Sequence, residues 1–375
     1  MGTNLYTARN IFCSRERCAR HSRTLTILLL ALSGFFSGYS QTTPLSFTQI
    51  PYGSADLIAP GRGVEHWNGV NWDNNSGIQI PAGNTQALNY YARFNWVDIE
   101  SSGSQGSYSW TAFDNQMHKA MDAGAMFSFG VMPICSGCGL GGYGYPTYLH
   151  NLMQGEGSNS RDWQNSGGLW VPNWNSPNWL GRWAALMTAI ANHINSTTYN
   201  GKSYKDAIYY IDVRGYGDYG EWHTYPWTGT EPSGRTATVA SLESIVNAVK
   251  SAFPNYPLQI AMGAFDTKDA SMMPPEFCYY ALTTSNAWGQ IGWRRDNLGD
   301  AGYASYLSGN SGSYSGSSFS TLIMNKWKYA PIGGEPANDL TAISRNCGVI
   351  QCDLVNEITT FHIASFGNGN YPVSK

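Results

Sequence analysis

The fold of this chain is decided around residues 207–223, which read AIYYIDVRGYGDYGEWH. The first five residues are apolar, aromatic or β-branched, a composition typical of a buried strand. Glycines, three carboxylates, an arginine, a tryptophan and a histidine follow directly. Glycines allow sharp turns and close approach of the backbone to a ligand, and a protein core has no need of such a mixture. The stretch therefore predicts a buried strand that opens into the rim of an active site.

The same unit of short strand, glycine- or aromatic-rich loop and helix recurs along the chain. Strands are expected at residues 63–67, 90–96, 126–132, 208–213, 258–262, 290–293, 331–334 and 361–366. Helices are expected at residues 110–123, 179–194, 239–253 and 320–329, from apolar spacings of three and four. Eight such strands favour a parallel (β/α)8 TIM barrel without a clear final helix. An open doubly wound sheet is the alternative, but no Gly-rich dinucleotide or phosphate loop follows an early strand.

Residues 1–40 differ from the remainder of the chain. Five arginines precede the apolar run Leu25–Leu32, and small residues lead to Ser40, which is the pattern of a secretory signal peptide. The apolar run is too short to span a bilayer. We therefore expect export to the periplasm or the medium, a lead-in at residues 41–57, and a barrel domain at residues 58–375 that does not insert into a membrane.

Charge and composition restrict the class of partner. Residues 1–40 hold five of the 22 basic and one of the 25 acidic residues, which leaves 17 and 24 and a formal net charge of −7. An acidic surface argues against nucleic acid and anionic membranes as partners. Aromatic residues, at 14%, are as frequent as charged ones, at 13%, which favours a rigid protein with aromatic-lined surfaces.

The cysteines after residue 40 suggest local links. Cys135 and Cys138 have the spacing of a redox or zinc motif, but no second such pair accompanies them. We expect a disulfide or free thiols there, with a metal site as the alternative. Cys347 and Cys352 could close a small loop in an exported protein.

Two long loops are expected, at residues 135–178 and 306–319. The second is rich in serine, glycine and tyrosine and is predicted to form a mobile flap or a disordered tip. The first holds Trp163, Trp170 and Trp174, and Trp179 follows it. Flat apolar rings with a polar N–H suit the walls of a ligand cleft. Taken singly, most of these tryptophans are expected in the core, but as a set some are expected to face a ligand.

Chemistry in a barrel of this kind takes place at the C-terminal ends of the strands. Glu221 follows the fourth expected strand and Glu335 the seventh, each directly after a glycine and 114 residues apart. Three strand–helix units separate them, which places them on opposite sides of the barrel mouth. Glycoside hydrolysis needs such a pair, because one carboxyl protonates the departing oxygen while the other attacks the anomeric carbon or activates water. A salt-bridged rim carboxylate is the alternative for either glutamate alone.

Other side chains at the strand ends are candidates for binding substrate. Arg93 and Arg294 are expected to orient a carboxylate, to bind sugar hydroxyls or to pair with a core acid. His223 and His362 are expected to position the two glutamates by hydrogen bonding. The complete set is Arg93, Trp96, Glu100, Asp212, Arg214, Asp218, Trp222, His223, Arg294, Asp296 and His362.

Several other chemistries lack their motifs. No Gly-x-Ser-x-Gly elbow occurs, which argues against an α/β-hydrolase nucleophile. No His-x-His or His-Glu-x-x-His sequence occurs, so no metal or other cofactor is expected. Convergence of His66, His223 and His362 on a metal is the alternative.

Six segments between about residues 58 and 370 resemble the retaining glycoside hydrolases of clan GH-A. More closely, the chain is similar to a secreted bacterial family of unassigned function with a β-galactosidase-like barrel. The matching segments are APGRG at 59–63, YARFNW at 91–96 with Glu100, GSYSW at 106–110 with Phe113 and Asp114, residues 212–223, GWRRD at 292–296 and GGEP at 333–336.

This resemblance implies that Glu221 is the acid/base and Glu335 the nucleophile. It departs from the clan at Gly220, where clan enzymes usually carry an asparagine that contacts the sugar 2-hydroxyl. That departure leaves Asp218 or Asp212 as alternative acids. We therefore expect a secreted glycosidase, of the retaining type that the clan implies, with a non-catalytic carbohydrate-binding barrel as the competing class.

Overall fold

The computed structural model describes residues 63–68, 89–101, 103–140, 142–224, 231–265, 273–298, 312–336, 358 and 360–367. All of them belong to one compact unit, residues 56–375. The expected signal peptide, the lead-in at 41–57 and the Cys347–Cys352 pair lie outside the described residues.

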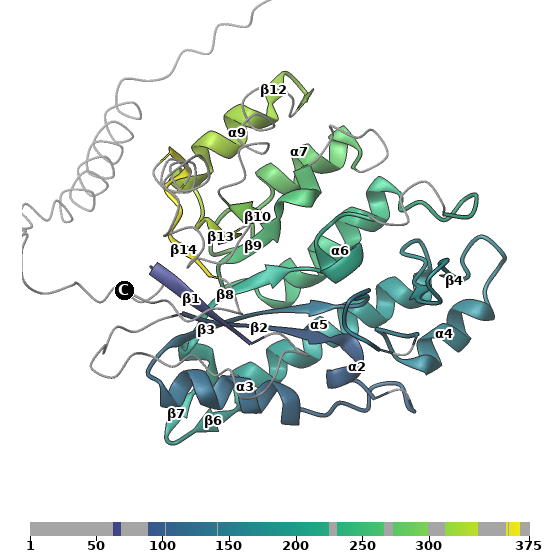
Figure 1. Ribbon diagram of the computed structural model, residues 1–375, viewed down its shortest axis with the longest axis horizontal. Coiled ribbons are helices and arrows are strands. Elements are labelled where there is room, and N and C mark those ends of the chain that lie inside the picture. The colour runs from purple at the N-terminus through teal and green to yellow at the C-terminus, as the bar shows by residue number, and fades with distance from the viewer. Residues whose placement is uncertain are drawn as a thin grey trace, which may run out of the picture. The chain divides into compact units, whose positions relative to one another are not determined.

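Eight parallel strands close into a barrel, in which each strand pairs with the next along the chain and the last pairs with the first (Figure 1). The strands are β1 (Gly63–Asn68), β2 (Asn89–Asn95), β3 (Met126–Met132), β8 (Ile208–Val213), β9 (Leu258–Ala261), β10 (Gly292–Leu298), β13 (Gly333–Pro336) and β14 (Ser365–Phe366). Pairing of Gly63 with Ser365 closes the sheet. The predicted TIM-barrel fold is confirmed.

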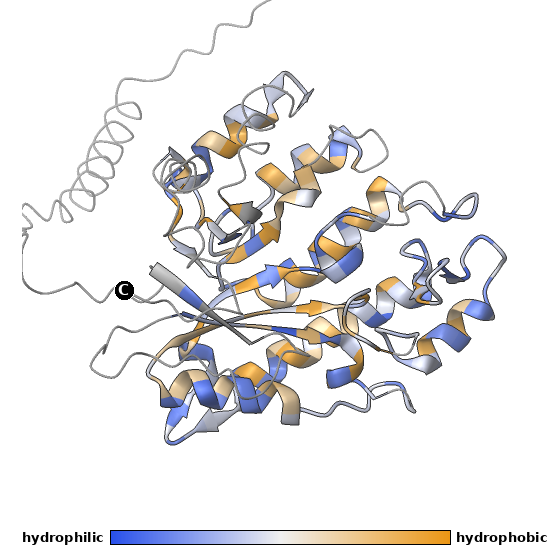
Figure 2. Ribbon diagram, in the orientation of Figure 1, coloured by the Kyte–Doolittle hydropathy of each residue, from blue (hydrophilic) through white to orange (hydrophobic). Residues whose placement is uncertain are grey.

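Helices cover the outside of this barrel (Figure 1). The helices of the described residues are α2 (Trp96–Ile99), α3 (Thr111–Asp122), α4 (Thr147–Gln154), α5 (Pro177–Ser196), α6 (Val239–Ala252), α7 (Pro275–Thr283) and α9 (Phe319–Asn325), and the 3-10 turns are η1 (Tyr204–Asp206), η2 (Asp218–Gly220), η3 (Met262–Phe265) and η4 (Lys326–Lys328). Helix α3 packs on β2 and β3, and α5, α6, α7 and α9 pack side by side in that order. Figure 2 shows apolar and polar residues on different faces of these helices.

Helix α5 illustrates how the sequence sets a boundary and a buried face. The Ser176 side chain accepts a hydrogen bond from the Trp179 amide, and Pro177 occupies the first turn, where its missing N–H is harmless. Trp179, Trp183 and Ile190 recur at helical spacing and are buried. Each such burial contributes about 1.5–3 kcal/mol, so the packed face stabilises the helix more than its cap does.

The barrel interior is polar, although branched apolar residues usually fill such barrels. Side chains alternate along a strand, so Tyr91 and Arg93 point the same way, as do Tyr210, Asp212 and Arg214. These five side chains are buried and contact one another or their neighbours across the barrel. Small residues on other strands make room for them. A Cβ on Gly130 of β3, for example, would lie 2.7 Å from the Cδ of Arg214.

Several predicted boundaries are wrong. Strand β10 starts at Gly292 and extends to Leu298, and β13 begins two residues later than expected. The eighth strand is only Ser365–Phe366, because residues 360–361 are helical. The expected loop 135–178 contains α4 and the hairpin of β4 (Trp163–Gln164) and β5 (Trp170–Val171).

Two further hairpins are short. Strands β6 (Thr198–Tyr199) and β7 (Lys202–Ser203) link α5 to β8, and β11 (Ser313–Tyr314) and β12 (Ser317–Ser318) lie within the expected flap 306–319. Among the described helices, none combines the length and the apolar character needed to cross a membrane.

Candidate active site

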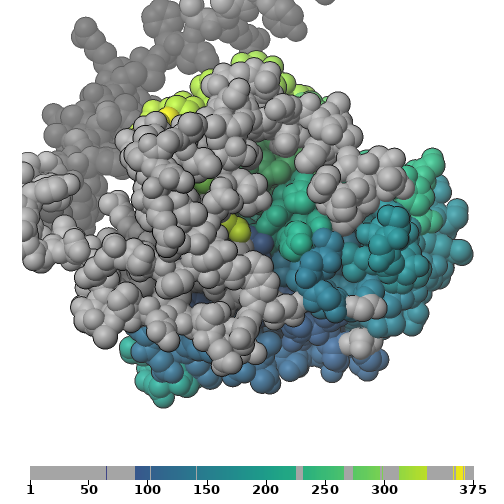
Figure 3. Space-filling model, viewed as in Figure 1, coloured from purple at the N-terminus to yellow at the C-terminus, as the bar shows by residue number. Residues whose placement is uncertain are grey.

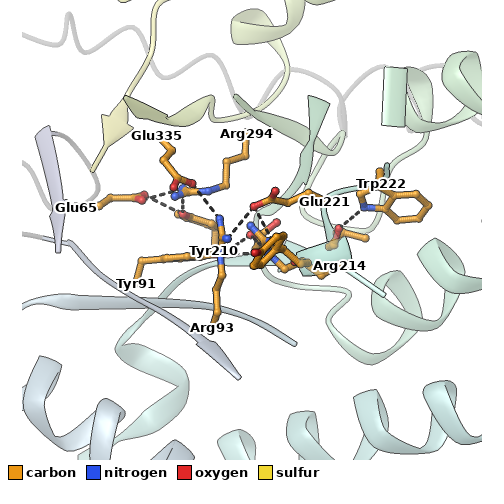
Figure 4. A network of polar contacts seen from close by, with 12 residues as sticks. Glu65, Tyr91, Arg93, Tyr210, Arg214, Glu221, Trp222, Arg294 and Glu335 are labelled. Carbon is orange, nitrogen blue, oxygen red and sulfur yellow. Dashed lines mark hydrogen bonds and ion pairs between the residues drawn. The ribbon is translucent and has the colours of Figure 1, made fainter. Parts of the chain in front are cut away.

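Glu221 and Glu335 meet on one guanidinium at the C-terminal mouth of the barrel (Figure 4). Arg93, near the end of β2, reaches the Oε1 of Glu221 with Nη1 at 2.7 Å and the Oε2 of Glu335 with Nη2 at 3.0 Å. The three side chains are 9–17% exposed, so they are accessible but largely shielded from solvent. The two predicted carboxylates are therefore brought together, by an arginine that the sequence also singled out.

A hollow lies in the face of the molecule seen in Figure 3. Late (yellow-green), middle (teal) and early (purple) segments of the chain all reach its floor. Segments that are far apart in the sequence therefore contribute to one depression, as expected where the ends of several parallel strands converge.

A second layer of buried polar groups supports these three side chains. Arg214 contacts the Oδ2 of Asp212 at 2.6 Å and the Tyr91 hydroxyl at 3.1 Å, and Tyr91 donates to the same carboxylate. The Nε of Arg93 lies 3.3 Å from the Tyr91 hydroxyl. Burial is the main reason that the pKa of Tyr91 rises to about 12. The phenol therefore stays protonated and can donate to Asp212 at any physiological pH.

The loop after β8 turns sharply to present Glu221. Its backbone has positive φ at Gly215, Gly217 and Gly220, and also at Tyr219 (51°) and Trp222 (64°). Glycine tolerates this region, whereas other residues rarely adopt it. Arg214, in the barrel interior, stabilises this turn. Its Nη1 donates to the carbonyl oxygen of Tyr219 and lies 3.4 Å from the Oε1 of Glu221.

Gly220 has no room for a side chain. Its φ is +66°, and a Cβ at this position would lie 2.7 Å from the Cβ of Arg214. The close approach of Arg214 therefore accounts for glycine at position 220, where the resemblance to the clan predicts an asparagine.

The environment of Glu221 favours the carboxylate over the acid. Burial opposes ionisation, but Arg93, a hydrogen bond with His223 and Arg214 together outweigh it and hold the pKa of Glu221 well below its ordinary value. The His223 Nε2 lies 3.5 Å from the Oε2 of Glu221. His223 thus lies where the sequence predicted it, against one of the two glutamates.

The two alternative acids are committed to other contacts. Asp212 is buried beneath the mouth between Tyr91 and Arg214. Asp218 is also buried and accepts hydrogen bonds from the amide and hydroxyl of Ser136. Burial raises the pKa of Asp218, while the Ser136 hydrogen bonds oppose that shift. Of these three carboxylates in β8 and the loop that follows it, Glu221 is the one that reaches the mouth.

Three residues predicted to bind substrate are instead fully buried parts of the scaffold. The indole of Trp96 donates to Glu100 at 2.8 Å, and Glu100 also accepts from Arg182 at 2.7 Å. The indole of Trp222 donates to the carbonyl of Val213 at 2.7 Å. Their positions near strand ends suggested a role in binding a ligand. All three side chains are instead buried between the strands and the surrounding helices.

The structure corrects the predicted role of His362 and does not describe two other predicted side chains. His362 precedes β14 by three residues, at the N-terminal end of the barrel, where its ring packs on Trp327 at 4.0 Å between ring centroids. It is therefore on the opposite end from Glu335. The side chains of Asp296 and His66 lie outside the described part of the chain.

Arg294 and the loop tryptophans are mainly structural. Arg294 pairs with Glu65 inside the barrel at 2.8 Å. Trp163, Trp174 and Trp179 are buried core residues, so these three do not line a cleft. Trp170 is half-buried against Tyr143 and His150.

Sequence reasoning missed the interior residues Glu65, Tyr91 and Tyr210. Glu65 accepts from Tyr210 at 2.8 Å and pairs with Arg294, whose guanidinium lies 4.3 Å from the centroid of the Tyr91 ring. A signal was present, because Tyr91 and Tyr210 each precede a predicted site residue by two positions, and residues two apart share one side of a strand.

The cysteine pair after β3 is a disulfide, Cys135–Cys138. This selects the disulfide among the alternatives that the sequence left open. The described residues contain no group of three or more histidine, cysteine or acidic side chains placed to hold a metal ion.

No family model and no curated protein matches this sequence. Solved structures with a similar fold include the catalytic domain of β-amylase from Paenibacillus polymyxa, 12% identical, covering 74% of this chain and 84% of that one with a TM-score of 0.47. Endo-glycoceramidase II from Rhodococcus sp. is 13% identical, with 76% and 65% covered and a TM-score of 0.45. A psychrophilic glycoside hydrolase family 10 endo-β-1,4-xylanase is 11% identical, with 83% and 86% covered and a TM-score of 0.41. These similar structures are glycoside hydrolases, but likenesses this remote assign no activity to the chain.

Proposed function

We propose that this protein is a retaining glycoside hydrolase in which Glu335 is the nucleophile and Glu221 the acid/base. The convergence of the two carboxylates on Arg93 carries the proposal, since it joins the ends of β8 and β13 within the span of one guanidinium. Retaining enzymes need their two carboxyl groups close together, at about 5–5.5 Å, whereas inverting enzymes leave room for a water.

In the proposed reaction, an oxygen of Glu335 attacks the anomeric carbon while Glu221 donates its proton to the departing glycosidic oxygen. The bond between that carbon and that oxygen breaks, and a glycosyl ester forms on Glu335. Glu221 then takes a proton from a water, which attacks the same carbon and releases both the sugar and the Glu335 carboxylate.

Arg93 determines how Glu221 can act as an acid. While the Nη1 of Arg93 binds Glu221, the pKa of this carboxyl stays too low for it to carry a proton at neutral pH. We propose that substrate displaces Nη1 from Glu221 while Nη2 stays on Glu335. Burial then raises the pKa of Glu221, because the strongest opposing charge is gone, and Arg93 keeps Glu335 ionised as a nucleophile.

The same low pKa favours a second candidate, a carbohydrate-binding barrel without hydrolysis. In that case Glu221 and Glu335 stay ionised and accept hydrogen bonds from sugar hydroxyls. Calorimetric titration with a glycan, followed by analysis of that glycan, distinguishes the two candidates. A binding barrel gives heat of binding and leaves the glycan intact, whereas a hydrolase cleaves it.

A substrate screen with three matched variants tests the proposal. Aryl α- and β-glycosides and plant and microbial polysaccharides are assayed with wild type, Glu221→Gln, Glu335→Gln and the exposed control Glu276→Gln. We expect Glu335→Gln to abolish turnover and Glu221→Gln to lower kcat by about 10²–10⁴-fold on poor leaving groups. The control is expected to match wild type. Equal activity of all four proteins would exclude this pair of catalytic residues.

The stereochemistry of the product separates retention from inversion. NMR of the first-formed sugar should show the anomer of the substrate. Azide added to Glu221→Ala should give a glycosyl azide of the same configuration, because azide replaces water in the second step. A product of opposite configuration in the wild-type reaction would show that Glu335 activates water instead.

Export completes the proposal. The Arg-rich start and apolar run of residues 1–40 motivate it, and the Cys135–Cys138 disulfide supports it, since disulfides persist in oxidising compartments. Expression of the whole chain in a bacterium with fractionation of periplasm and medium tests this. Full-length protein that stays in the cytoplasm would contradict it.

A further inference from the structure

The disulfide loop after β3 interlocks with the loop that carries Glu221. Ser136, between the two cysteines, donates from its amide to the Oδ1 of Asp218 at 2.8 Å and from its hydroxyl to the Oδ2 at 2.5 Å. Gly137 has no side chain where a Cβ would collide with the Tyr219 hydroxyl. The two loops therefore contact each other through two successive pairs of residues, Ser136 with Asp218 and Gly137 with Tyr219.

Asp218 in turn sets the position of Glu221. The Glu221 amide donates to the Asp218 carbonyl at 2.9 Å, and the Asp218 amide donates to the His223 carbonyl at 2.9 Å. Between these contacts, Tyr219 and Trp222 both hold positive φ. Non-glycine residues are strained in that region and persist there only where the surroundings impose it. The contacts to Ser136 are part of what imposes this shape.

The disulfide is open to chemical attack from one side. Cys135 is buried, whereas Cys138 is half-buried and Ser136 and Gly137 are exposed. A thiolate from solvent can therefore approach the Sγ of Cys138 more readily than that of Cys135, and access is one of the factors that control thiol–disulfide exchange.

We propose that the Cys135–Cys138 disulfide is a redox-sensitive latch that keeps Glu221 in its working position through Ser136 and Asp218. The inference deepens the proposed glycosidase function and rests on it for its effect on activity. In the reductive step, a dithiol attacks the Sγ of Cys138 and Cys135 leaves as a thiolate. The second thiol of the reagent closes on the mixed disulfide and frees Cys138, so the protein gains two electrons and two protons while the dithiol becomes a cyclic disulfide.

Hydrogen exchange tests the latch without any assay of activity. The protein is compared before and after full reduction with dithiothreitol, with alkylation and mass analysis to confirm two new thiols at 135 and 138. We expect amides in residues 217–223 to exchange about tenfold to a hundredfold faster, as loss of two charge-assisted hydrogen bonds predicts. Unchanged exchange in this loop after complete reduction would overturn the latch.

Matched variants connect the latch to the reaction. Ser136→Ala, which keeps both cysteines, and Cys135→Ser/Cys138→Ser are compared with the exposed control Ser158→Ala. We expect the first two to lower kcat by about tenfold to a hundredfold with little change in KM, the effect of a misplaced catalytic group. The double variant should no longer respond to dithiothreitol, whereas wild type and the control lose activity and regain it on reoxidation.

Failure of the latch and failure of the proposed function give different results. Faster exchange of residues 217–223 together with no hydrolysis of any glycoside supports the latch and rejects the glycosidase. Hydrolysis that is equally fast in the oxidised and the fully reduced protein rejects the latch and leaves the glycosidase in place.

Discussion

Arg93 connects the two glutamates of the candidate site, and it is the main group that holds the pKa of Glu221 below its ordinary value. It contributes one N–H to each carboxylate, and its own pKa is raised because Tyr91, Glu221 and Glu335 together outweigh the opposing effect of burial. In the proposed reaction, Arg93 keeps its contact with Glu335 and gives up its contact with Glu221.

Replacing Arg93 by methionine should change the stability of the protein and its pH dependence. In wild type the pKa of Glu221 is depressed, so this group stabilises the fold above its unfolded pKa of about 4.3, and that stabilisation is lost as pH falls through the folded pKa. In Arg93→Met burial dominates, so the Glu221 anion becomes destabilising at neutral pH. We expect a loss of about 3–5 kcal/mol at pH 7.

Denaturant unfolding at pH 7 and pH 4 measures this effect. The difference between Arg93→Met and wild type should shrink at pH 4, because protonation of Glu221 removes the unpaired charge. Arg161→Met, at an exposed site, is the control and should match wild type at both pH values. A difference that grows as pH falls would show that Glu221 is not the partner that matters.

The loop between β8 and α6 is the element on which the geometry of the site depends. Five of its residues between 215 and 222 have positive φ, and two of these are not glycine. Hydrogen bonds from Arg214 to Tyr219 and from Ser136 to Asp218 stabilise the turn. An element of this kind is shaped by its tertiary contacts, because its local sequence alone does not favour that backbone.

Gly220→Ala and Gly124→Ala separate backbone strain from steric collision. Both glycines have φ near +66°, but a Cβ at Gly124 meets nothing within 4 Å, whereas one at Gly220 lies 2.7 Å from the Cβ of Arg214. We expect Gly124→Ala to cost about 1–2 kcal/mol from conformation alone. Gly220→Ala should cost about 1–3 kcal/mol more, from overpacking. Equal losses in urea unfolding would mean that Arg214 yields without penalty.

Closure of the barrel joins the two ends of the described chain through buried polar groups. Glu65 of β1 accepts from the Ser365 hydroxyl of β14 at 2.9 Å and from Tyr210 of β8, and it pairs with Arg294 of β10. Four strands thus meet on one carboxylate in the barrel interior. Polar contacts at the scale of the whole barrel support the mouth in which Glu221 and Glu335 lie.

Breaking this junction should destabilise the whole barrel. Glu65→Gln leaves the buried charge of Arg294 without its ionised partner, so we expect a loss of about 3–5 kcal/mol in the free energy of unfolding. The double variant Glu65→Leu/Arg294→Met should lose less free energy of unfolding than the sum of the losses in Glu65→Leu and Arg294→Met, because neither charge remains. Denaturant unfolding of the full cycle measures this, with exposed Glu276→Gln within about 0.5 kcal/mol of wild type. Additive losses would contradict direct coupling.

Much of the architecture was predictable from the sequence, because apolar periodicity is a local property. The eight strands and the helices near 110, 180 and 240 appear close to their predicted positions. The eighth strand shows the limit of this reasoning. It was expected at residues 361–366 but is only Ser365–Phe366, so His362 lies before the strand and not within it. Even the expected bounds place His362 at the N-terminal start of the strand, away from the mouth, because side chains near the first residue of a barrel strand lie at the opposite end from the site.

The sequence by itself determined the barrel and the two carboxylates, because strand composition and a glycine before each glutamate are encoded locally. Only the tertiary structure decided which neighbours those carboxylates have. It placed Arg93 between them, buried Trp96 and Trp222 in the scaffold, and joined Ser136 to Asp218. The physical reason is that charge, burial and collision depend on groups that are distant in sequence. The stretch at 207–223 thus contains the acid/base candidate, whereas Arg93 of β2 lowers its pKa and Ser136, which follows β3, contacts its loop.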